Sequence, residues 1–222
     1  MSILVEAAVE SLDDALAAVE GGADRLELCA NLAAGGLTPA APVVTEVLER
    51  VGVPVCVMIR PRGGSFTYSR TELDLMRRDL GTMRELGVDG IVTGVLDDRL
   101  AVDTRRMELL VSAADGLPVT FHRAFDRVRD YRDALESLID LGIERVLTSG
   151  GASTALAGVD VLGELAQQAG DALVVIAGGG VRDYNVREIV ERSGVREVHA
   201  RCESDAARIA GIVAALAADV SG

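Results

Sequence analysis

The stretch that decides the fold is Thr120-Phe121-His122-Arg123-Ala124-Phe125-Asp126. Pro118 and Val119 lead into it as the start of an apolar strand, which then ends in a histidine, an arginine and an aspartate. Charged side chains are costly to place where a core strand ends, unless they have a function there. The same change from apolar strand to polar tip recurs along the chain, and this recurrence indicates the architecture.

Eight short apolar runs alternate with stretches of helical spacing. The apolar runs cover residues 3–9, 25–30, 53–60, 90–96, 117–125, 145–150, 172–178 and 197–202. The helical stretches include residues 11–19, 73–86, 133–141, 186–191 and 205–216. Several of these begin at a capping residue, such as Ser11 or Asp133, and many end at a glycine.

Eight strands that alternate with helices indicate a parallel sheet. Closed into a ring, such a sheet is a TIM barrel, and the chain is long enough to form a compact one. We therefore predict an α/β fold in which residues 1–222 form a single-domain (β/α)8 barrel. The alternative is an open, doubly wound sheet.

The composition excludes several classes of function. The net charge of −13 argues against nucleic acid and anionic membranes as partners, and no apolar run approaches the roughly 18 residues of a membrane span. All 22 basic residues are arginine, so no lysine Schiff base can form. The N-terminus does not read as a signal peptide, and three cysteines do not suggest a disulfide framework. These features predict a cytoplasmic protein, and no organic cofactor is implied.

Polar side chains collect at the carboxyl ends of the predicted strands, where the active sites of such barrels lie. Alternation along each strand decides which residues point to the barrel axis. The residues assigned to this inward face are Glu6, Glu27, Cys29, Cys56, Met58, Arg60, Thr93, Thr120, His122, Thr148, His199 and Arg201. A packed barrel interior prefers branched apolar residues, so the polar set predicts a functional mouth. A register error of one residue would scatter it.

Three loops at these tips predict an anion site. Residues 60–64 read Arg-Pro-Arg-Gly-Gly, in which arginine forks suit carboxylate or phosphate and the glycines expose backbone N–H groups. Residues 148–151 and 178–182 are glycine-rich loops after late strands, where barrels often hold phosphate. The candidate anion-binding residues are Arg60, Arg62, Arg123, Ser149, Gly150, Gly179 and Gly180. The alternative is that these loops are surface turns with solvated arginines, or tight turns from strand to helix.

Four residues are candidates for proton exchange. An unperturbed histidine titrates near neutrality, so His122 could act as a general acid or base, and Asp126 could orient it. The carboxylates Glu6 and Glu27 lie on the inward face of the first two strands. His199 reads equally well as a hydrogen-bonded core histidine.

Cys29 and Cys56 lie on neighbouring strands, which are about 4.8 Å apart in a sheet. Two thiolates that close could hold a soft ion such as Cu(I), with Met58 as a further ligand. The alternative is that both cysteines are small core residues, because no CxxC or zinc-like spacing accompanies them. Cys202 has the opposite parity to His199 and is expected to pack.

Taken together, the motifs resemble the copper homeostasis protein CutC family. The matching segments lie in order at residues 22–29, 35–39, 59–64, 92–96, 120–126, 146–150, 178–182 and 197–199. The resemblance implies a cytoplasmic barrel protein named for copper tolerance, with Cu(I) bound by cysteines, and Cys29 matches the family's recurrent cysteine. The chain departs from the family at Ala7 and Ala8, where a cysteine often follows the glutamate. It also has a short segment after His199, where Glu203 leads almost directly into the last helix.

Two functions are therefore weighed. The first is a copper homeostasis protein that binds Cu(I) through Cys29 and Cys56. The second is a barrel enzyme of unknown reaction, in which arginines hold a small anionic or phosphorylated substrate and Glu27 and His122 exchange protons, with Glu6 as a second carboxylate. A purely structural scaffold fits poorly with so many polar strand tips. The sequence leaves open whether the chain is an enzyme and whether it forms a homodimer.

Overall fold

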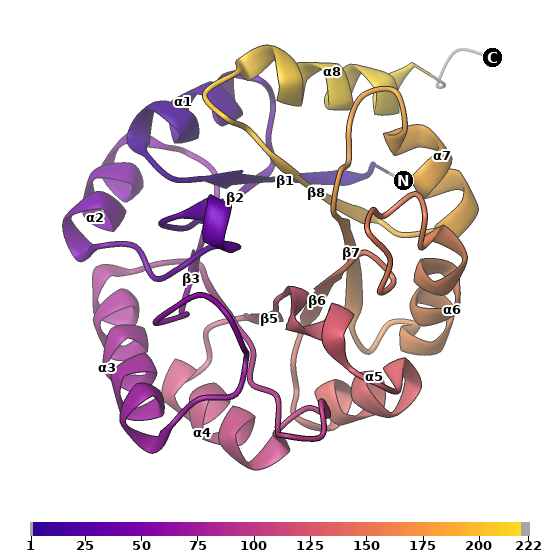
Figure 1. Cartoon of the computed structure of the whole chain (residues 1–222). Helices are drawn as coiled ribbons and strands as arrows, with labels where there is room; N and C mark the ends of the chain where they lie inside the picture. Colours follow the sequence, from indigo (N-terminus) through magenta and orange to yellow (C-terminus); the bar gives the residue numbers. More distant parts are fainter. Residues whose placement is uncertain (1, 219–222) are drawn as a thin grey trace.

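The computed structural model describes residues 2–218, in which eight parallel strands close into a barrel and eight α-helices surround it (Figure 1). The strands are β1 (Leu4–Val9), β2 (Arg25–Leu28), β3 (Val55–Met58), β4 (Gly90–Thr93), β5 (Val119–Phe121), β6 (Arg145–Thr148), β7 (Val174–Gly178) and β8 (Glu197–Arg201). The α-helices are α1 (Leu12–Glu20), α2 (Ala41–Arg50), α3 (Arg70–Leu86), α4 (Thr104–Ala114), α5 (Tyr131–Asp140), α6 (Val159–Ala169), α7 (Val186–Ser193) and α8 (Ala206–Ala217). Two short 3-10 helices, η1 (Leu32–Ala34) and η2 (Arg123–Arg127), lie in the loops after β2 and β5.

The first and last strands complete the barrel. β1 pairs with β8 in parallel register, with Leu4 opposite Glu197 and Glu6 opposite His199. Every other neighbouring pair of strands follows the order of the chain. The predicted (β/α)8 barrel is therefore confirmed. The open doubly wound sheet is wrong, because such a sheet would leave two edge strands unpaired.

Two helix starts were predicted from a capping residue, and one of them is confirmed. Ser11 caps α1, as predicted, by accepting a hydrogen bond from the N–H of Asp14. Helix α5 begins earlier than predicted, because Asp130 rather than Asp133 accepts from the first free N–H groups. Within residues 2–218, no helix has the length and apolarity needed to cross a membrane.

Apolar side chains form two separate clusters. The larger one fills the space between the strands and the surrounding helices. The smaller one lies inside the barrel and consists of Ala8, Cys29, Leu32, Cys56, Met58 and Val92. Toward the amino-terminal ends of the strands the interior is instead polar, with Arg25, Arg145 and Glu197. The barrel therefore carries charged groups on a rigid frame rather than a fully apolar core.

The alternation of side chains corrects two residues that were predicted to face the barrel interior. Val92 belongs to the inner cluster, so Thr93 lies on the opposite face, where its hydroxyl donates to the Ile59 carbonyl at 3.0 Å. Leu147 lines the cavity at the barrel mouth, so Thr148 likewise lies on the opposite face. Both threonines are the last residues of their strands. The prediction assigned the last residue of each of these two strands to the inward face, which is an error of one residue in the alternation.

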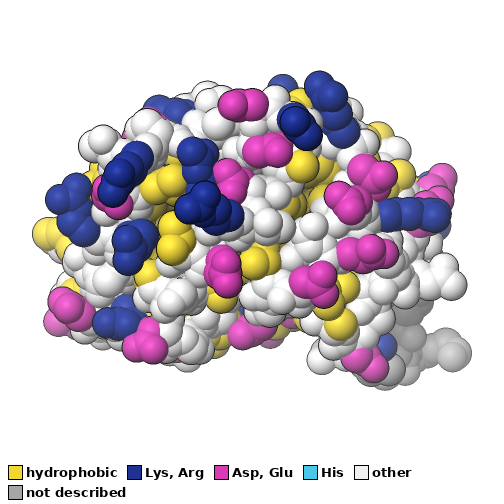
Figure 2. Space-filling model, turned by 90° about the horizontal axis from the view of Figure 1, so that it is seen from below, with side chains coloured by type: hydrophobic (Ala, Val, Ile, Leu, Met, Phe, Trp, Pro, Cys, Tyr) yellow, Lys and Arg dark blue, Asp and Glu magenta, His cyan; other side chains and the backbone are white. Residues whose placement is uncertain are grey.

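Charge is spread unevenly over the outer surface. In the view of Figure 2, arginines are most crowded over the left half of the face, whereas acidic side chains are scattered over both halves. A groove along α3 and α4 is lined by four arginines (Arg70, Arg77, Arg105, Arg106) and four aspartates (Asp74, Asp97, Asp98, Asp103). This groove therefore has no excess of positive charge of the kind that nucleic acid binding requires.

Candidate functional site

A cavity of about 460 Å³ is lined by residues near the carboxyl ends of the strands and by the loops that follow them. Six of the predicted site residues line it: Glu27, Arg60, His122, Arg123, Gly179 and Gly180. Seven others do not belong to its lining: Glu6, Cys29, Cys56, Arg62, Asp126, Ser149 and Gly150. The structure thus brings about half of the predicted residues to one place.

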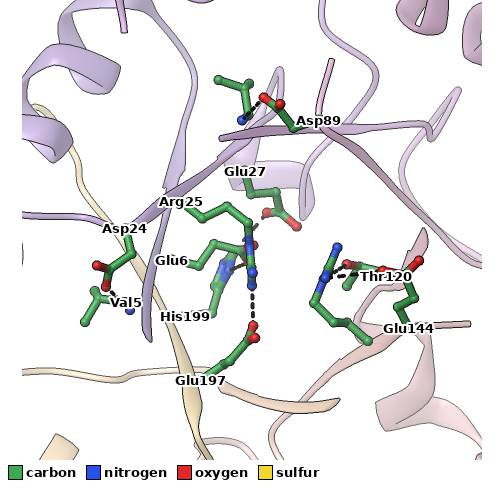
Figure 3. A network of polar contacts seen from close by, with 12 residues as sticks. Val5, Glu6, Asp24, Arg25, Glu27, Asp89, Thr120, Glu144, Glu197 and His199 are labelled. Atoms are coloured by element: carbon green, nitrogen blue, oxygen red, sulfur yellow. Dashed lines mark hydrogen bonds and ion pairs between the residues drawn. The ribbon is translucent and has the colours of Figure 1, made fainter. Parts of the chain in front are cut away.

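Next to the cavity, buried charged side chains form a connected network (Figure 3). Arg25 donates hydrogen bonds to Glu6 and to Glu197. The second carboxylate oxygen of Glu6 lies 2.8 Å from Nδ1 of His199. Nε2 of His199 lies 3.7 Å from Oε2 of Glu27, so one imidazole lies between two carboxylates. The pairing of β1 with β8 explains this contact, because Glu6 and His199 are register partners.

The network fixes the protonation of its members. Burial alone would raise the pKa of Glu6, but the hydrogen bond with His199 and the charge of Arg25 outweigh it and lower the pKa to about 2. Burial alone would lower the pKa of His199, but the carboxylates of Glu27 and Glu6 hold that pKa above its ordinary value. Burial raises the pKa of Glu27. Glu6 is therefore an anion that favours the protonated form of His199, while the Glu27 carboxyl is suited to exchange a proton.

The same three residues offer oxygen and nitrogen atoms that lie within 4.8 Å of one another, a spacing that one metal ion could occupy. A cation there would displace the proton that His199 holds. It would also lie near Arg25, which already neutralises Glu6. Oxygen and imidazole ligands are moreover not the soft sulfur ligands that Cu(I) prefers. We therefore interpret Glu6, Glu27 and His199 as a proton-sharing cluster.

His122 is a second imidazole with a different electrostatic environment. The N–H of Ala124 donates to its Nδ1 at 3.2 Å, so the proton of the neutral ring must be on Nε2. Nε2 is buried and has no hydrogen-bond partner. Burial, together with the charge of Arg60, lowers the pKa of His122 to about 3. His122 is therefore a neutral N–H donor near pH 7, which changes the predicted role of general acid or base.

Asp126 does not orient His122, contrary to the prediction. Its carboxylate accepts hydrogen bonds from the Thr148 hydroxyl and from the N–H of Ser149, and it pairs with Arg123. The chain turns into η2 directly after His122, and this turn carries Asp126 toward β6. Asp126 therefore ties the loop after β6 to η2.

Two residues of the loop after β6 were predicted to bind an anion, and both are used for packing. The hydroxyl of Ser149 donates to the Ala152 carbonyl at 2.7 Å. Gly150 approaches Gly158 so closely that a Cβ atom would lie 2.4 Å from its carbonyl oxygen. The geometry therefore does not favour Ser149 and Gly150 as anion ligands. From the same loop, Ser153 and Thr154 line the cavity instead.

Arg62 is turned away from the cavity, so its predicted anion-binding role is not supported. It forms an ion pair with Glu72 and lies over the ring of Tyr68 at 5.0 Å. Arg60 does line the cavity and is buried, and its terminal nitrogens donate to three backbone carbonyls. Its Nε atom is left without a hydrogen-bond partner.

Three arginines of the cavity lining form no ion pair with a carboxylate among the described residues: Arg60, Arg182 and Arg201. Arg182 follows β7 and Arg201 ends β8. The same lining includes Gly179 and Gly180, whose φ angles of 105° and 70° suit glycine. In a chain with a net charge of −13, convergent arginines without counter-ions indicate a site for an anion.

Cys29 and Cys56 belong to the inner apolar cluster together with Met58, and both are buried. Because Glu27 pairs with Cys56 across β2 and β3, Cys29 lies one layer nearer the mouth than Cys56. Burial and the nearby Glu27 raise the pKa of Cys29, whose thiol donates to that carboxylate at 3.5 Å. Burial raises the pKa of Cys56 to about 12. The two sulfur atoms therefore lie in different layers of the barrel. Both are favoured as thiols, whereas the thiolate is the form that binds a metal ion.

Four residues of the site were given no catalytic or binding role from the sequence, although His199 and Arg201 had been placed on the inward face of their strand. His199 was treated as equally consistent with a core histidine, and only the closure of β1 on β8 reveals its pairing with Glu6. Arg182 lies in the loop after β7 and Arg201 is the last residue of β8, and these positions at the ends of late strands were the signal that could have identified them. Phe66 lies in a long loop before α3, and no sequence pattern places it against His122.

Comparisons with known proteins agree on one family. The sequence model of the CutC family matches residues 3–204. The chain is 45% identical over 209 residues to the copper homeostasis protein cutC homolog of Homo sapiens. The aligned residues cover 94% of this chain and 76% of the human protein. It is 46% identical over 197 residues to a CutC family protein of Caulobacter vibrioides, covering 89% of this chain and 80% of the relative.

Solved structures give the same picture. A crystal structure assigned as copper homeostasis protein CutC from Streptococcus agalactiae has a TM-score of 0.85 and 36% identity, covering 89% of this chain and 97% of that one. Phosphoribosylanthranilate isomerase from Thermotoga maritima has a TM-score of 0.64 at 14% identity, covering 96% of this chain and 98% of that one. The second likeness concerns the fold alone.

Proposed function

Because the chain belongs to the CutC family, we propose that it shares the part in copper homeostasis for which its relatives are named, and that it does so as an enzyme. Its substrate is a small anionic molecule that enters the cavity at the barrel mouth. The observation that carries this proposal is the convergence of Arg60, Arg182 and Arg201 on one cavity without carboxylate partners. Arginine forks of this kind bind carboxylate or phosphate groups.

The reacting groups lie on the strand side of the same cavity. Glu27 and His199 both line it, and the distance between Nε2 of His199 and Oε2 of Glu27 is 3.7 Å. Glu6 and Arg25 act as positioning residues, because they hold His199 without lining the cavity. Arginines thus bind the anion in one part of the cavity, and Glu27 and His199 exchange protons in another. Enzymes that act on small molecules combine binding groups and acid–base groups in one cavity in this way.

Replacing Arg182 with glutamine should weaken the binding of inorganic phosphate by roughly 10- to 100-fold, because a charge-assisted hydrogen bond contributes about 1.5–3 kcal/mol. Isothermal titration calorimetry with inorganic phosphate measures this. The matched control is Arg77→Gln, which removes an arginine from the exposed face of α3 and should leave the affinity unchanged. Equal affinities for both variants and the unaltered chain would place the anion elsewhere.

A second candidate function is the binding of Cu(I) as cargo through Cys29 and Cys56. The observation that favours it is the gathering of both thiols and the Met58 thioether in one buried cluster. Sulfur ligands in an apolar setting suit a soft ion. Binding requires both thiols to lose their protons and the sulfurs to move into one layer.

On this second proposal, the reduced chain competes with a chromophoric chelator for one equivalent of Cu(I), and the Cys29→Ser/Cys56→Ser double variant does not. Titration of the chelator complex by absorbance gives the result. Cys202→Ser is the matched control, since this buried thiol lies after β8 and outside the inner cluster. Unchanged competition by the double variant would contradict a copper site at these cysteines.

We further propose a cytoplasmic location. The cysteines of the described chain are all free and buried, which suits a reducing compartment. A homodimer stays a prediction from the sequence.

A further inference from the structure

Three buried polar atoms around the cavity have no hydrogen-bond partner: Nε2 of His122, Nε of Arg60 and Oε1 of Glu27. All three residues line the cavity. Unpaired buried polar atoms are rare in native proteins, and each one calls for an explanation. Two of these atoms are N–H donors and the third is a carboxyl oxygen. A bound molecule that accepts two hydrogen bonds and presents a proton would satisfy all three.

Both donor residues contact the same aromatic ring. The Phe66 ring lies 5.0 Å from the His122 ring, and the Arg60 guanidinium lies 4.7 Å from the centre of the same Phe66 ring. His122 also packs against Gly94, where a Cβ atom would lie 2.6 Å from the imidazole. Both N–H groups are therefore fixed in place before any ligand binds, as the stabilisation of a developing oxyanion requires.

The acceptor comes from a different strand. Glu27 lies on β2, whereas His122 directly follows β5. The Oε2 atom of Glu27 contacts the Cys29 thiol and faces His199. The Oε1 atom of Glu27 is therefore the one available to a substrate. A substrate between the two strands would have the carboxyl group on one side and the two donors on the other.

We propose that the substrate is a carbonyl compound that carries an anionic group, and that the reaction begins with removal of a proton from the carbon beside the carbonyl. This inference rests on the function proposed above and names its substrate class. Oε1 of Glu27 takes the proton, the electron pair of the C–H bond forms a carbon–carbon double bond, and the carbonyl pair moves to oxygen. Nε2–H of His122 and Nε–H of Arg60 donate to that oxygen. Return of the proton to the same carbon completes an exchange. Where that carbon also carries a hydroxyl group, transfer of the hydroxyl proton to the enolate oxygen and return of the first proton to the former carbonyl carbon complete an isomerisation. No electrons are gained or lost in either case.

The electrostatics of both groups agree with this geometry. A neutral imidazole is a suitable donor to an enolate oxygen, as known isomerases with a glutamate base illustrate. Burial and the charge of Arg60 lower the pKa of His122 and keep its ring neutral. Burial raises the pKa of Glu27, which makes its carboxylate a stronger base.

The test compares two phosphate probes of similar size by titration calorimetry. 2-Phosphoglycolate carries a planar carboxylate that imitates the enolate oxygens, whereas ethyl phosphate carries none. We expect 2-phosphoglycolate to bind at least 10-fold more tightly. The His122→Asn variant, whose amide oxygen can still accept from the Ala124 N–H, should lose most of that difference and keep its affinity for ethyl phosphate.

The outcomes separate this inference from the function on which it rests. If neither probe binds, the anion-binding function itself fails. If both bind equally well to the unaltered chain, the anion site stands and the carbonyl inference is overturned. Nitrogen-15 NMR of the two histidines gives a second measurement that needs no variant. The Nε2–H signal of His122 should shift downfield with 2-phosphoglycolate and not with ethyl phosphate, and an unchanged signal with both would also overturn the inference.

Discussion

Replacing Arg25 with methionine should lower the free energy of unfolding by about 3–5 kcal/mol, the usual effect of removing one partner from a buried ion pair. The side chains of Arg25 and Glu6 are only 8% and 1% exposed, so water does not take over the lost contact. Glu197 loses the same partner. The buried carboxylate of Glu6 and the partly buried one of Glu197 would then lack their shared cation, and Glu6 would still repel the nearby Glu27. Urea-induced unfolding at pH 7, followed by circular dichroism, measures the loss.

The matched control for this prediction is Arg192→Met. Arg192 also pairs with two carboxylates, Glu188 and Asp160, but its side chain is 46% exposed. Exposed ion pairs contribute about 0–1 kcal/mol, so this variant should remain close to the unaltered chain. Equal losses for the Arg25 and Arg192 variants would mean that the interior of the barrel is wet and that its charges are screened.

Acidification should destabilise the protein through His122. Its pKa is about 3 in the folded chain and 6.5 in the absence of the fold, so the unfolded chain binds the proton first as pH falls. The stability contributed by the neutral ring is complete above pH 6.5 and is lost progressively toward pH 3, with a slope of about 1.4 kcal/mol per pH unit. Between pH 7.5 and pH 4.5 the loss should reach about 3 kcal/mol.

The variant His122→Asn isolates this contribution, because asparagine does not titrate. Urea unfolding of both proteins at several pH values between 7.5 and 4.5 gives two stability curves, and their difference should shrink by the amount expected for His122. All other titrating groups, including the buried Glu27 and His199, are common to both proteins and largely cancel. Parallel curves would contradict a lowered pKa of His122 in the folded chain.

The fold could be predicted from the sequence because it depends on periodic signals. Each strand is a short apolar run, and several helices are bounded by residues such as Ser11 and Gly87 that act through local backbone geometry. Local signals repeated eight times leave few architectures to choose from. The positions of individual side chains depend on register, and there a shift of one residue misplaced Thr93 and Thr148.

The site was predicted in part for the same reason. Glu27, Arg60 and His122 follow directly from strand alternation, and all three line the cavity. Asp126 and Arg62 lie in loops, whose paths depend on contacts with distant segments. Their charges serve the loops rather than a ligand. A charged residue beside a strand tip is therefore ambiguous until its counter-ion is known, and counter-ions are a property of the folded chain.

The pairing of Glu6 with His199 joins residues 193 positions apart. A chain emerging from the ribosome presents Glu6, Arg25 and Glu27 long before His199 is synthesised. Contacts of such high sequence separation form only when the ends of the chain meet, which makes them late events in folding. The proton-sharing cluster consequently cannot exist in a nascent chain or in a half barrel. Its assembly coincides with the closure of β1 on β8, so the cluster forms only after β8 has been synthesised.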